Sequence, residues 1–418
     1  MSTQVGYVTR PHYHRMLHSA DWLCFARTAE TMKILHIDTH PEWRGGQFLV
    51  LFTIRGQRAR NHDALLMTLR DTLLARRAIE EGIPVHYLPR RFVRVGGALC
   101  LREILKQQRF DVVHVHDPHA LTVAWLARAH RSAALMISRR LALPPSRGLG
   151  QARYRAARRI IAVSNFVART IISSGIPRDR VVVVHDGIDI PADTTPEVRR
   201  EAREEWGIGS EEALIGCVGY LVPGKRQDIA LRAFARAIQK FPGCKLLIAG
   251  NGQDREALEK LAMELRISDR VLFAGFIEDI ERVYRALDLF LFPAVGEALP
   301  TSLLVAMSHR LPCIAAASGA VPEMIDSGRN GILVGTPIGS TLQEAIAAEA
   351  GDVNTQAPHS MKEQISSEFA DAICKLLADP EHSARIGEAA RQTIIDRFSI
   401  DALTEGTLNV YESVLSLT

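Results

Sequence analysis

Short apolar runs alternate with amphipathic stretches along most of the chain, beginning at residue 32. The runs are rich in Val, Ile and Leu, which is typical of strands buried on both faces. Most of them are separated by stretches with helical periodicity, such as residues 71–81 and 97–108. A first series of strands is expected at 32–38, 64–69, 84–88, 111–116, 134–138, 159–164 and 181–185. Strand then helix, repeated, predicts a parallel sheet covered by helices on both faces.

A charged, turn-rich stretch interrupts this pattern after residue 189, and a second series of apolar runs follows. Its strands are expected at 213–220, 245–250, 270–276, 287–293, 312–317 and 331–334. The fold class is therefore α/β, with two Rossmann-like domains at 32–187 and 188–402 and a ligand in the cleft between them. Segment 336–366 has no strand pattern and is expected to be a surface insertion.

Three helical stretches are expected to close the chain, at about 366–378, 383–397 and 400–416. The last of them, within 403–418, is expected to pack back on the first domain.

Length and composition agree with two globular domains. The chain has 418 residues, of which 47% are hydrophobic and 23% are charged, and no apolar run reaches the roughly 18 residues that span a bilayer. Residues 1–31 lack the features of a signal peptide; we expect a disordered extension or an over-long reading frame. The six cysteines form no Cys-x-x-Cys pair, so reduced thiols in the cytoplasm are expected.

Charge is unevenly distributed. Residues 1–180 hold 29 Lys and Arg against 12 Asp and Glu, and 27 of the 29 are arginine. The excess is either a general preference for Arg on solvated faces or an attraction to anionic lipid or a phosphate-bearing acceptor. Nucleic acid is not expected as a partner, because no recognition motif accompanies the charge.

Two features of the first half could carry chemistry. Gly45 and Gly46 follow the first strand, where glycines either form a plain turn or let the backbone approach a ligand. His114 and His116 alternate with valines in DVVHVHDP, so period two places both on one face at the carboxyl end of a strand. His116, the last in the strand, is the better candidate, although a strand histidine is usually structural.

In the second half, Lys225 and Arg226 lie in a strand-to-helix loop. Two cations there can neutralise a diphosphate, or they can simply be solvated. Asn251, between two glycines in the next such turn, marks another site where the backbone can approach a ligand.

The segment EALPTSLLVAM begins at Glu297 and joins a strand to a helix start at Pro300 and Thr301. A helix N-terminus can hold a phosphate. A lone carboxylate there would accept hydrogen bonds from sugar or ribose hydroxyls. No metal site is expected, since the spacings that metal ligands require are absent from these loops.

Taken in order, these segments resemble glycosyltransferase family 4, retaining enzymes of the GT-B fold. The resemblance runs from about residue 32 to the end. Its elements are Gly45–Gly46, DVVHVHDP, AVSNFVA, VVHDGID, VGYLVPGKRQD, LLIAGNGQDREALEKLA, VLFAGFIEDI, EALPTSLLVAM and SGAVPEMIDSGRNGILV.

The resemblance implies that His116, Lys225 and Glu297 act on the transferred sugar and its diphosphate. It implies further donor contacts at Gly45, Gly46, Arg226, Asn251, Ile277, Ala298, Leu299, Pro300 and Thr301. No cofactor or metal is implied; the co-substrate is a UDP-, GDP- or ADP-linked sugar. The acceptor is a glycan or a lipid-linked molecule of cell-envelope, exopolysaccharide or lipopolysaccharide synthesis, reached in the cytoplasm or at the inner face of the membrane.

Two positions depart from the family. Val305 stands where a second Glu is usual, and it cannot bond to the donor ribose. Tyr220 stands where Arg is frequent, and Arg226 occupies a position that is usually glycine. These departures motivate an alternative, a catalytically silent GT-B protein that binds a partner. A sugar-nucleotide 2-epimerase is a third option, for which the sequence offers no matching set of acids.

Overall fold

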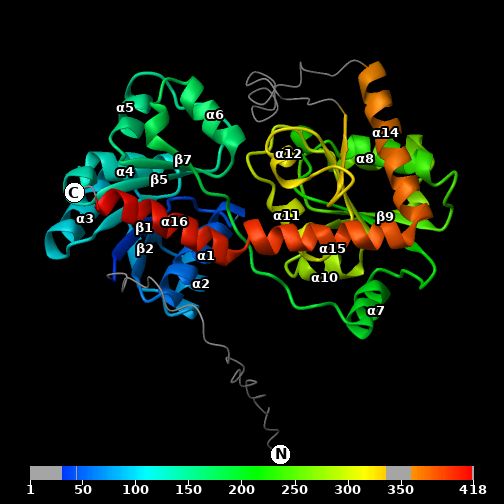
Figure 1. The fold of residues 1–418 in the computed structure, drawn as a ribbon, viewed down its shortest axis with the longest axis horizontal. Coiled ribbons are helices and arrows are strands. Elements are labelled where there is room, and N and C mark those ends of the chain that lie inside the picture. The colour runs from blue at the N-terminus through cyan, green and yellow to red at the C-terminus, as the bar shows by residue number, and fades with distance from the viewer. Residues whose placement is uncertain (1–30, 44, 336–358, 417–418) are drawn as a thin grey trace, which may run out of the picture. The chain divides into compact units, whose positions relative to one another are not determined.

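The computed structural model describes residues 31–43, 45–335 and 359–416. Residues 32–418 form one compact unit, built on two parallel sheets with helices around each (Figure 1). All thirteen predicted strand segments are confirmed. The sheet strands are β1 (Lys33–Ile37), β2 (Asp63–Leu69), β3 (Val85–Leu88), β4 (Val112–Val115), β5 (Ala134–Arg139), β6 (Arg159–Ala162), β7 (Val181–Val183), β8 (Ala213–Val218), β9 (Cys244–Ala249), β10 (Val271–Gly275), β11 (Leu289–Phe292), β12 (Cys313–Ala316) and β13 (Ile332–Val334).

The strand order of both sheets reverses once. The first sheet runs β3-β2-β1-β4-β5-β6-β7 and the second runs β10-β9-β8-β11-β12-β13. Order therefore reverses between β1 and β4, and again between β8 and β11. In open α/β sheets, ligands bind outside the carboxyl ends of the strands at such a reversal. The loops after these four strands are where a site is expected.

Helices cover both faces of each sheet. They are α1 (Gly45–Ala59), α2 (Leu73–Glu80), α3 (Val93–Gln107), α4 (Pro118–Leu126), α5 (Leu149–Arg155), α6 (Asn165–Ser173), α7 (Pro196–Glu205), α8 (Gln227–Ala237), α9 (Arg255–Glu264), α10 (Glu281–Ala286), α11 (Thr301–Ser308), α12 (Val321–Met324), α14 (His359–Ala378), α15 (Pro380–Arg397) and α16 (Ile400–Leu415), with short 3-10 turns η1 (Ala129–Arg131), η2 (Arg178–Arg180), η3 (Pro223–Lys225) and η4 (Ser268–Arg270). None of the described helices is long and apolar enough to cross a membrane.

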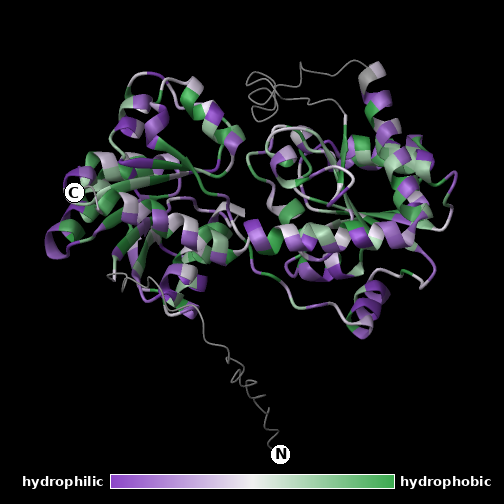
Figure 2. Cartoon of the chain, viewed as in Figure 1, coloured by the Kyte–Doolittle hydropathy of each residue, from purple (hydrophilic) through white to green (hydrophobic). Residues whose placement is uncertain are grey.

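The sequence pattern explains the packing. Strands of both sheets are largely apolar along their length, while the helices carry an apolar side and a polar side (Figure 2). Four apolar clusters result, two for each sheet. Burial of apolar area at about 25 cal/mol per Å² is the main favourable term for such layers.

The last helix belongs to the first sheet although it ends the chain. α16 packs against α1, β5 and β6, and its Leu403 and Tyr411 join the core beneath β1. The helices lie so close that a Cβ atom on Gly56 of α1 would be 1.9 Å from the Thr404 hydroxyl oxygen. Residue 56 must therefore be glycine for α16 to reach this position.

The chain passes between the sheets twice, and the two passages pair with each other. Ile188 donates its backbone N–H to Phe398 and accepts one from Ile400. The domain boundaries predicted at 187 and 402 lie close to this pairing and stay a prediction.

One helix begins earlier than expected. α14 starts at His359, seven residues before the predicted start at 366, so the end of the predicted insertion is wrong. Lys362 pairs with Asp228, and Glu363 pairs with Arg232, which fixes this turn of α14 against α8. The rest of that insertion, residues 336–358, lies outside the described part of the chain, as does nearly all of the predicted extension 1–31.

Candidate active site

The second sheet brings a lysine and a glutamate together at its strand-order reversal. Lys225 ends η3 in the loop after β8, and Glu297 lies in the loop after β11. The Lys225 ammonium is 2.7 Å from the Glu297 carboxylate, and about a quarter of each side chain is exposed, 22% and 24% respectively. These two predicted residues therefore meet, and both remain open to solvent and to a ligand.

Neighbouring loops hold Glu297 through its backbone. Its carbonyl oxygen accepts from the N–H of Ala320, and the adjacent Gly296 donates to the Ser318 hydroxyl. Gly319 has φ +59°, and a Cβ there would be 2.5 Å from the Glu297 carbonyl oxygen, so only glycine fits. The carboxylate projects from a backbone that hydrogen bonds keep in place.

Arg226 adds a second cation with an unused donor. Its backbone is left-handed, with φ +54°, and its Nε lies 3.2 Å from the Asp228 carboxylate. Its buried Nη2 has no hydrogen-bond partner within the described structure. A buried, unpartnered guanidinium nitrogen is costly unless a ligand supplies an acceptor.

Two helix N-termini meet beside this ion pair. Gly45 is the first residue of α1 and Thr301 the first of α11, and neither helix has an acidic residue in its first turn. A Cβ on Gly45 would lie 3.2 Å from the Thr301 hydroxyl oxygen, whereas one on Gly46 would meet nothing within 4 Å. Two positive helix ends that face each other favour binding of an anion.

The first sheet gathers three histidines at its own reversal. His36 of β1 pairs in register with His114 of β4, and His116 directly follows β4. All three are buried, and the ring centroids of His36 and His116 are 5.1 Å apart. His114 and His116 lie on one face, as period two predicted.

A chain of hydrogen bonds fixes the protonation of these rings. Arg140 can only donate, so the His116 Nδ1 atom, 3.0 Å from Arg140 Nη1, accepts. In the neutral ring, His116 Nε2 then donates to His36 Nδ1 at 2.8 Å. His36 Nε2 in turn donates to the Gln57 oxygen, also at 2.8 Å.

The same chain continues to the last helix. The Gln57 amide nitrogen donates to the Tyr411 hydroxyl at 3.4 Å, and that hydroxyl donates to His114 Nδ1 at 2.5 Å. His114 Nε2 is left to donate to Ser138 Oγ at 2.8 Å. Each ring has one donor and one acceptor nitrogen, and each nitrogen is used.

The electrostatics agree with neutral rings. Burial lowers the pKa of His36 to about 4, and burial with the neighbouring cations lowers the pKa of His114 and His116 well below the usual value. The histidines therefore carry no charge at neutral pH.

Arg140 is held by a buried acid. Its Nε and Nη2 both contact the Asp186 carboxylate, at 2.9 and 2.8 Å, and the two side chains are 12% and 4% exposed. Asp186 supplies the charge that keeps Arg140 beside His116.

Two further carboxylates lie at this edge. Burial and the neighbouring Asp117 raise the pKa of Asp38, which accepts from the Gln47 amide. Asp117 accepts from the Thr39 hydroxyl and caps α4 through the N–H groups of His119 and Ala120. These bonds fix the loops after β1 and β4.

The three histidines also form a group with metal-type donor atoms. Their ring nitrogens lie within 4.8 Å of one another. Because every one of these nitrogens already has a hydrogen-bond partner, a bound ion would have to displace several of those bonds. The described geometry is explained by hydrogen bonding alone.

Known proteins that are similar to this chain are glycosyltransferases. Residues 43–191 match the description "Glycosyltransferase Family 4" and residues 198–363 match "Glycosyl transferases group 1". A D-inositol 3-phosphate glycosyltransferase of Mycolicibacterium smegmatis is 31% identical over 318 residues, covering 69% of this chain and 72% of that protein.

The chain belongs to glycosyltransferase family 4.

Another D-inositol 3-phosphate glycosyltransferase, from Mycobacterium sp. (strain KMS), is 33% identical over 279 residues. That match covers 61% of this chain and 62% of the relative, so the chain spans less than two thirds of that protein. The family models and these relatives show that the protein is a glycosyltransferase.

Solved structures show the same GT-B fold. A glycosyltransferase from Rickettsia africae superposes with a TM-score of 0.77 at 18% identity, covering 93% of this chain and all of that one. Anabaena HepE in complex with UDP and glucose has a TM-score of 0.73 at 22% identity, covering 91% of this chain and 100% of its own.

The other residues that the resemblance singled out have different surroundings. Ala298 accepts from the Ser164 hydroxyl at 2.6 Å, and Leu299 packs against the cores of both sheets. Pro300 caps α11 without a side-chain bond. Ile277 is partly buried after β10, and the Asn251 side chain is exposed.

Packing explains the glycines beside Asn251 without a ligand. A Cβ on Gly250 would be 2.0 Å from the Gly219 carbonyl oxygen, and one on Gly252 would be 2.1 Å from that of Leu221.

The two positions that depart from the family pattern differ in burial. Tyr220 is exposed, and Val305 is partly buried against the core of the second sheet.

Sequence reasoning missed His36, Gln57, Arg140 and Tyr411. His36 alternates with apolar residues in the first strand, the pattern that identified His114, and could have been found in that way. Arg140 and Tyr411 carry no local signal, because each reaches the histidines only through the fold.

Proposed function

We propose that the protein is a retaining glycosyltransferase that moves a sugar from a nucleotide diphosphate to a glycan or lipid-linked acceptor. One observation carries the proposal: the Lys225–Glu297 ion pair lies four residues before Thr301, the start of a helix that meets the start of α1 at Gly45. Cations and helix N-termini suit a diphosphate, and the carboxylate suits the hydroxyls of the attached sugar.

Donor binding would separate Lys225 from Glu297 and give each of them a new partner. The diphosphate takes over Lys225 and the free Nη2 of Arg226, and Glu297 turns to the sugar hydroxyls. The bond between the sugar and the diphosphate oxygen then breaks while the acceptor oxygen bonds to the same carbon. The acceptor proton leaves with the diphosphate, so the protein's task is to stabilise the departing charge.

His116 would contact the sugar from the opposite side of the cleft. Its ring is neutral and its tautomer is set by Arg140, so it presents a defined face without adding a charge. In this proposal no metal takes part, and the reaction is expected to proceed unchanged in the presence of a chelator.

The donor is tested by thermal unfolding with UDP, GDP, ADP and their common sugar conjugates. One base should raise the melting temperature in a concentration-dependent way, and mass spectrometry of the purified protein should find the same nucleotide. Nuclear magnetic resonance of the product then reports whether the anomeric configuration is kept. Inversion would contradict the retaining assignment.

A place in envelope or polysaccharide synthesis is supported by names of similar proteins. One structural neighbour is a lipopolysaccharide outer core galactosyltransferase, WaaB, with a TM-score of 0.63 at 19% identity. It covers 91% of this chain and 99% of its own.

We also propose that the enzyme is cytoplasmic and binds an anionic membrane through its arginines. Its binding to anionic vesicles should then weaken as the salt concentration rises.

The silent alternative rests on Val305 and Tyr220. A binding partner without catalysis would give no stabilisation with any nucleotide sugar, whereas an active enzyme should lose most of its transfer activity in both Lys225→Ala and His116→Ala. Full transfer by both variants would contradict the proposed site.

A further inference from the structure

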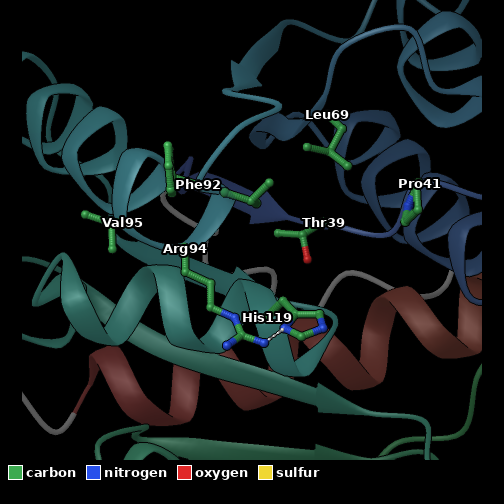
Figure 3. Close-up of a pocket in the computed structure, with 8 residues that line it drawn as sticks. Thr39, Pro41, Leu69, Phe92, Arg94, Val95 and His119 are labelled. Carbon is green, nitrogen blue, oxygen red and sulfur yellow. Dashed lines mark hydrogen bonds between the residues drawn. The ribbon is translucent and has the colours of Figure 1, made fainter.

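A pocket of about 560 Å³ opens at the carboxyl edge of the first sheet (Figure 3). The pocket lies close to His116. Two of its lining residues, Thr39 and His119, donate hydrogen bonds to Asp117, the residue that follows His116. Its lining residues are Thr39, Pro41, Leu69, Phe92, Val93, Arg94, Val95 and His119. Most of this lining is apolar, which is unlike a surface that binds only hydroxyl groups.

An exposed apolar stripe continues from the pocket along α3. Phe92, Val95 and Leu99 are 85%, 62% and 61% exposed, and their spacing places them along one side of the helix. Phe92 has φ +54°, a conformation that is uncommon for a bulky residue. Three large apolar side chains in a row on the surface mark a contact site rather than ordinary scatter.

Arginine flanks the same stripe. Arg94 donates from Nη2 to His119 Nδ1 at 3.0 Å, and Figure 3 shows its side chain turned toward that ring. Arg90 pairs with Asp71, whereas no acid within the described residues forms an ion pair with Arg91 or Arg94. The pocket therefore combines an apolar wall with one cation, Arg94, that has no acidic partner among the described residues.

We propose that this pocket and stripe bind a lipid acceptor whose anionic group lies against Arg94 and His119. Its hydrocarbon would lie along Phe92, Val95 and Leu99, and its hydroxyl would point toward His116. The inference rests on the proposed function, and it narrows the acceptor to an amphiphile. A polar glycan would leave the apolar wall of the pocket exposed to water. Each CH₂ group of a lipid that is buried against this wall adds favourable binding free energy.

The test uses the full-length protein and decyl phosphate below its micelle concentration. Isothermal calorimetry should show decyl phosphate binding at least tenfold more tightly than inorganic phosphate or an uncharged decyl glycoside. Val95→Ser and Leu99→Ser should each weaken decyl phosphate binding severalfold, and Arg94→Gln should remove the preference over the uncharged glycoside.

Met263→Ser is the matched control, because Met263 is also 62% exposed but lies on α9 of the second domain. It should leave decyl phosphate binding unchanged. Equal binding by wild type, Val95→Ser and Leu99→Ser would overturn the proposal, as would equal binding of inorganic phosphate. Concentration-dependent self-association lost in Val95→Ser, without decyl phosphate binding, would assign the stripe to a second copy and also overturn it.

Nucleotide stabilisation separates this proposal from the proposed function. Val95→Ser and Leu99→Ser should keep the wild-type shift in melting temperature with the donor nucleotide, because neither residue touches the anion site. If no nucleotide stabilises even the wild type, the donor proposal fails, and the pocket is still judged by decyl phosphate alone.

Discussion

The carboxyl edges of the two sheets share the same reversal of strand order, but their polar side chains differ in burial and in hydrogen bonding. At the first, His36, His114 and His116 are buried and every ring nitrogen has a partner. At the second, Lys225 and Glu297 are partly exposed and Arg226 keeps a buried nitrogen without a partner. The histidines of the first edge are paired within the protein, whereas the second edge keeps a buried donor without a partner among the described residues.

The difference separates stability from binding. Removing a member of a satisfied buried network leaves its neighbours unpaired, which lowers the free energy of unfolding. Removing a partly exposed cation such as Lys225 should change the free energy of unfolding little. It does remove a charge that would stabilise the departing diphosphate. The following experiments test this contrast.

Lys225→Ala should have the largest effect on transfer. Loss of one preorganised charge at the diphosphate is expected to lower kcat by about 10²- to 10³-fold, with an unchanged melting temperature. Lys245→Ala is the matched control, because Lys245 is 21% exposed and paired with Glu212 in the same domain. Equal activity of the two variants would remove Lys225 from the site.

His116→Ala should lose both activity and stability. It leaves Arg140 and His36 without their partner, so the free energy of unfolding measured in urea should fall by about 1–3 kcal/mol. Lys225→Ala, in comparison, should stay within about 0.5 kcal/mol of wild type. If the two variants were equally stable, the contrast between the two edges would be wrong.

The histidines should also make stability depend on pH. Their pKa values are lowered in the fold, so below pH 6.5 the unfolded chain binds more protons and stability is lost as the pH falls toward 4. The raised pKa of Asp38 acts in the opposite direction. His114→Asn should reduce the slope of unfolding free energy against pH by up to about 1.4 kcal/mol per unit, with almost the full reduction near pH 5 and about half of it near pH 6.5.

Urea unfolding at several pH values between 5 and 7 measures this slope. An unchanged slope in His114→Asn would mean that His114 is not held neutral by the fold.

Val305→Glu should have the smallest effect. A carboxylate at this position of α11 could accept from the donor ribose, and one such bond is worth about 0.5–1.5 kcal/mol. Donor affinity measured by calorimetry should therefore rise about two- to tenfold. Val305→Leu controls for packing, since Val305 contacts the core of the second sheet, and equal affinity in both variants would show that the position does not face the donor.

Much of the fold follows from local pattern. Strands buried on both faces must be apolar along their length, so β1 to β13 were all visible as short runs. The start of α14 was not visible, because its first turn is held by Lys362 and Glu363 pairing with α8. Those contacts join residues that are far apart in the sequence.

The candidate site residues also differ in how far the sequence alone predicts them. Glu297 and Lys225 lie between a strand and a helix, and Gly45 begins the helix after β1, so chain order alone predicts a ligand near them. Asn251 is different, because the glycines around it are required by close packing of the loops after β8 and β9.

The sequence by itself determined two parallel sheets, the loops in which a ligand is expected, and membership of a family of sugar transferases. Only the tertiary structure decided that Lys225 meets Glu297, that Asp186 holds Arg140 beside His116, and that Tyr411 joins the histidine chain. Local periodicity reports which side of an element is buried. Hydrogen-bond partners 297 residues apart, such as His114 and Tyr411, are chosen by how the layers stack.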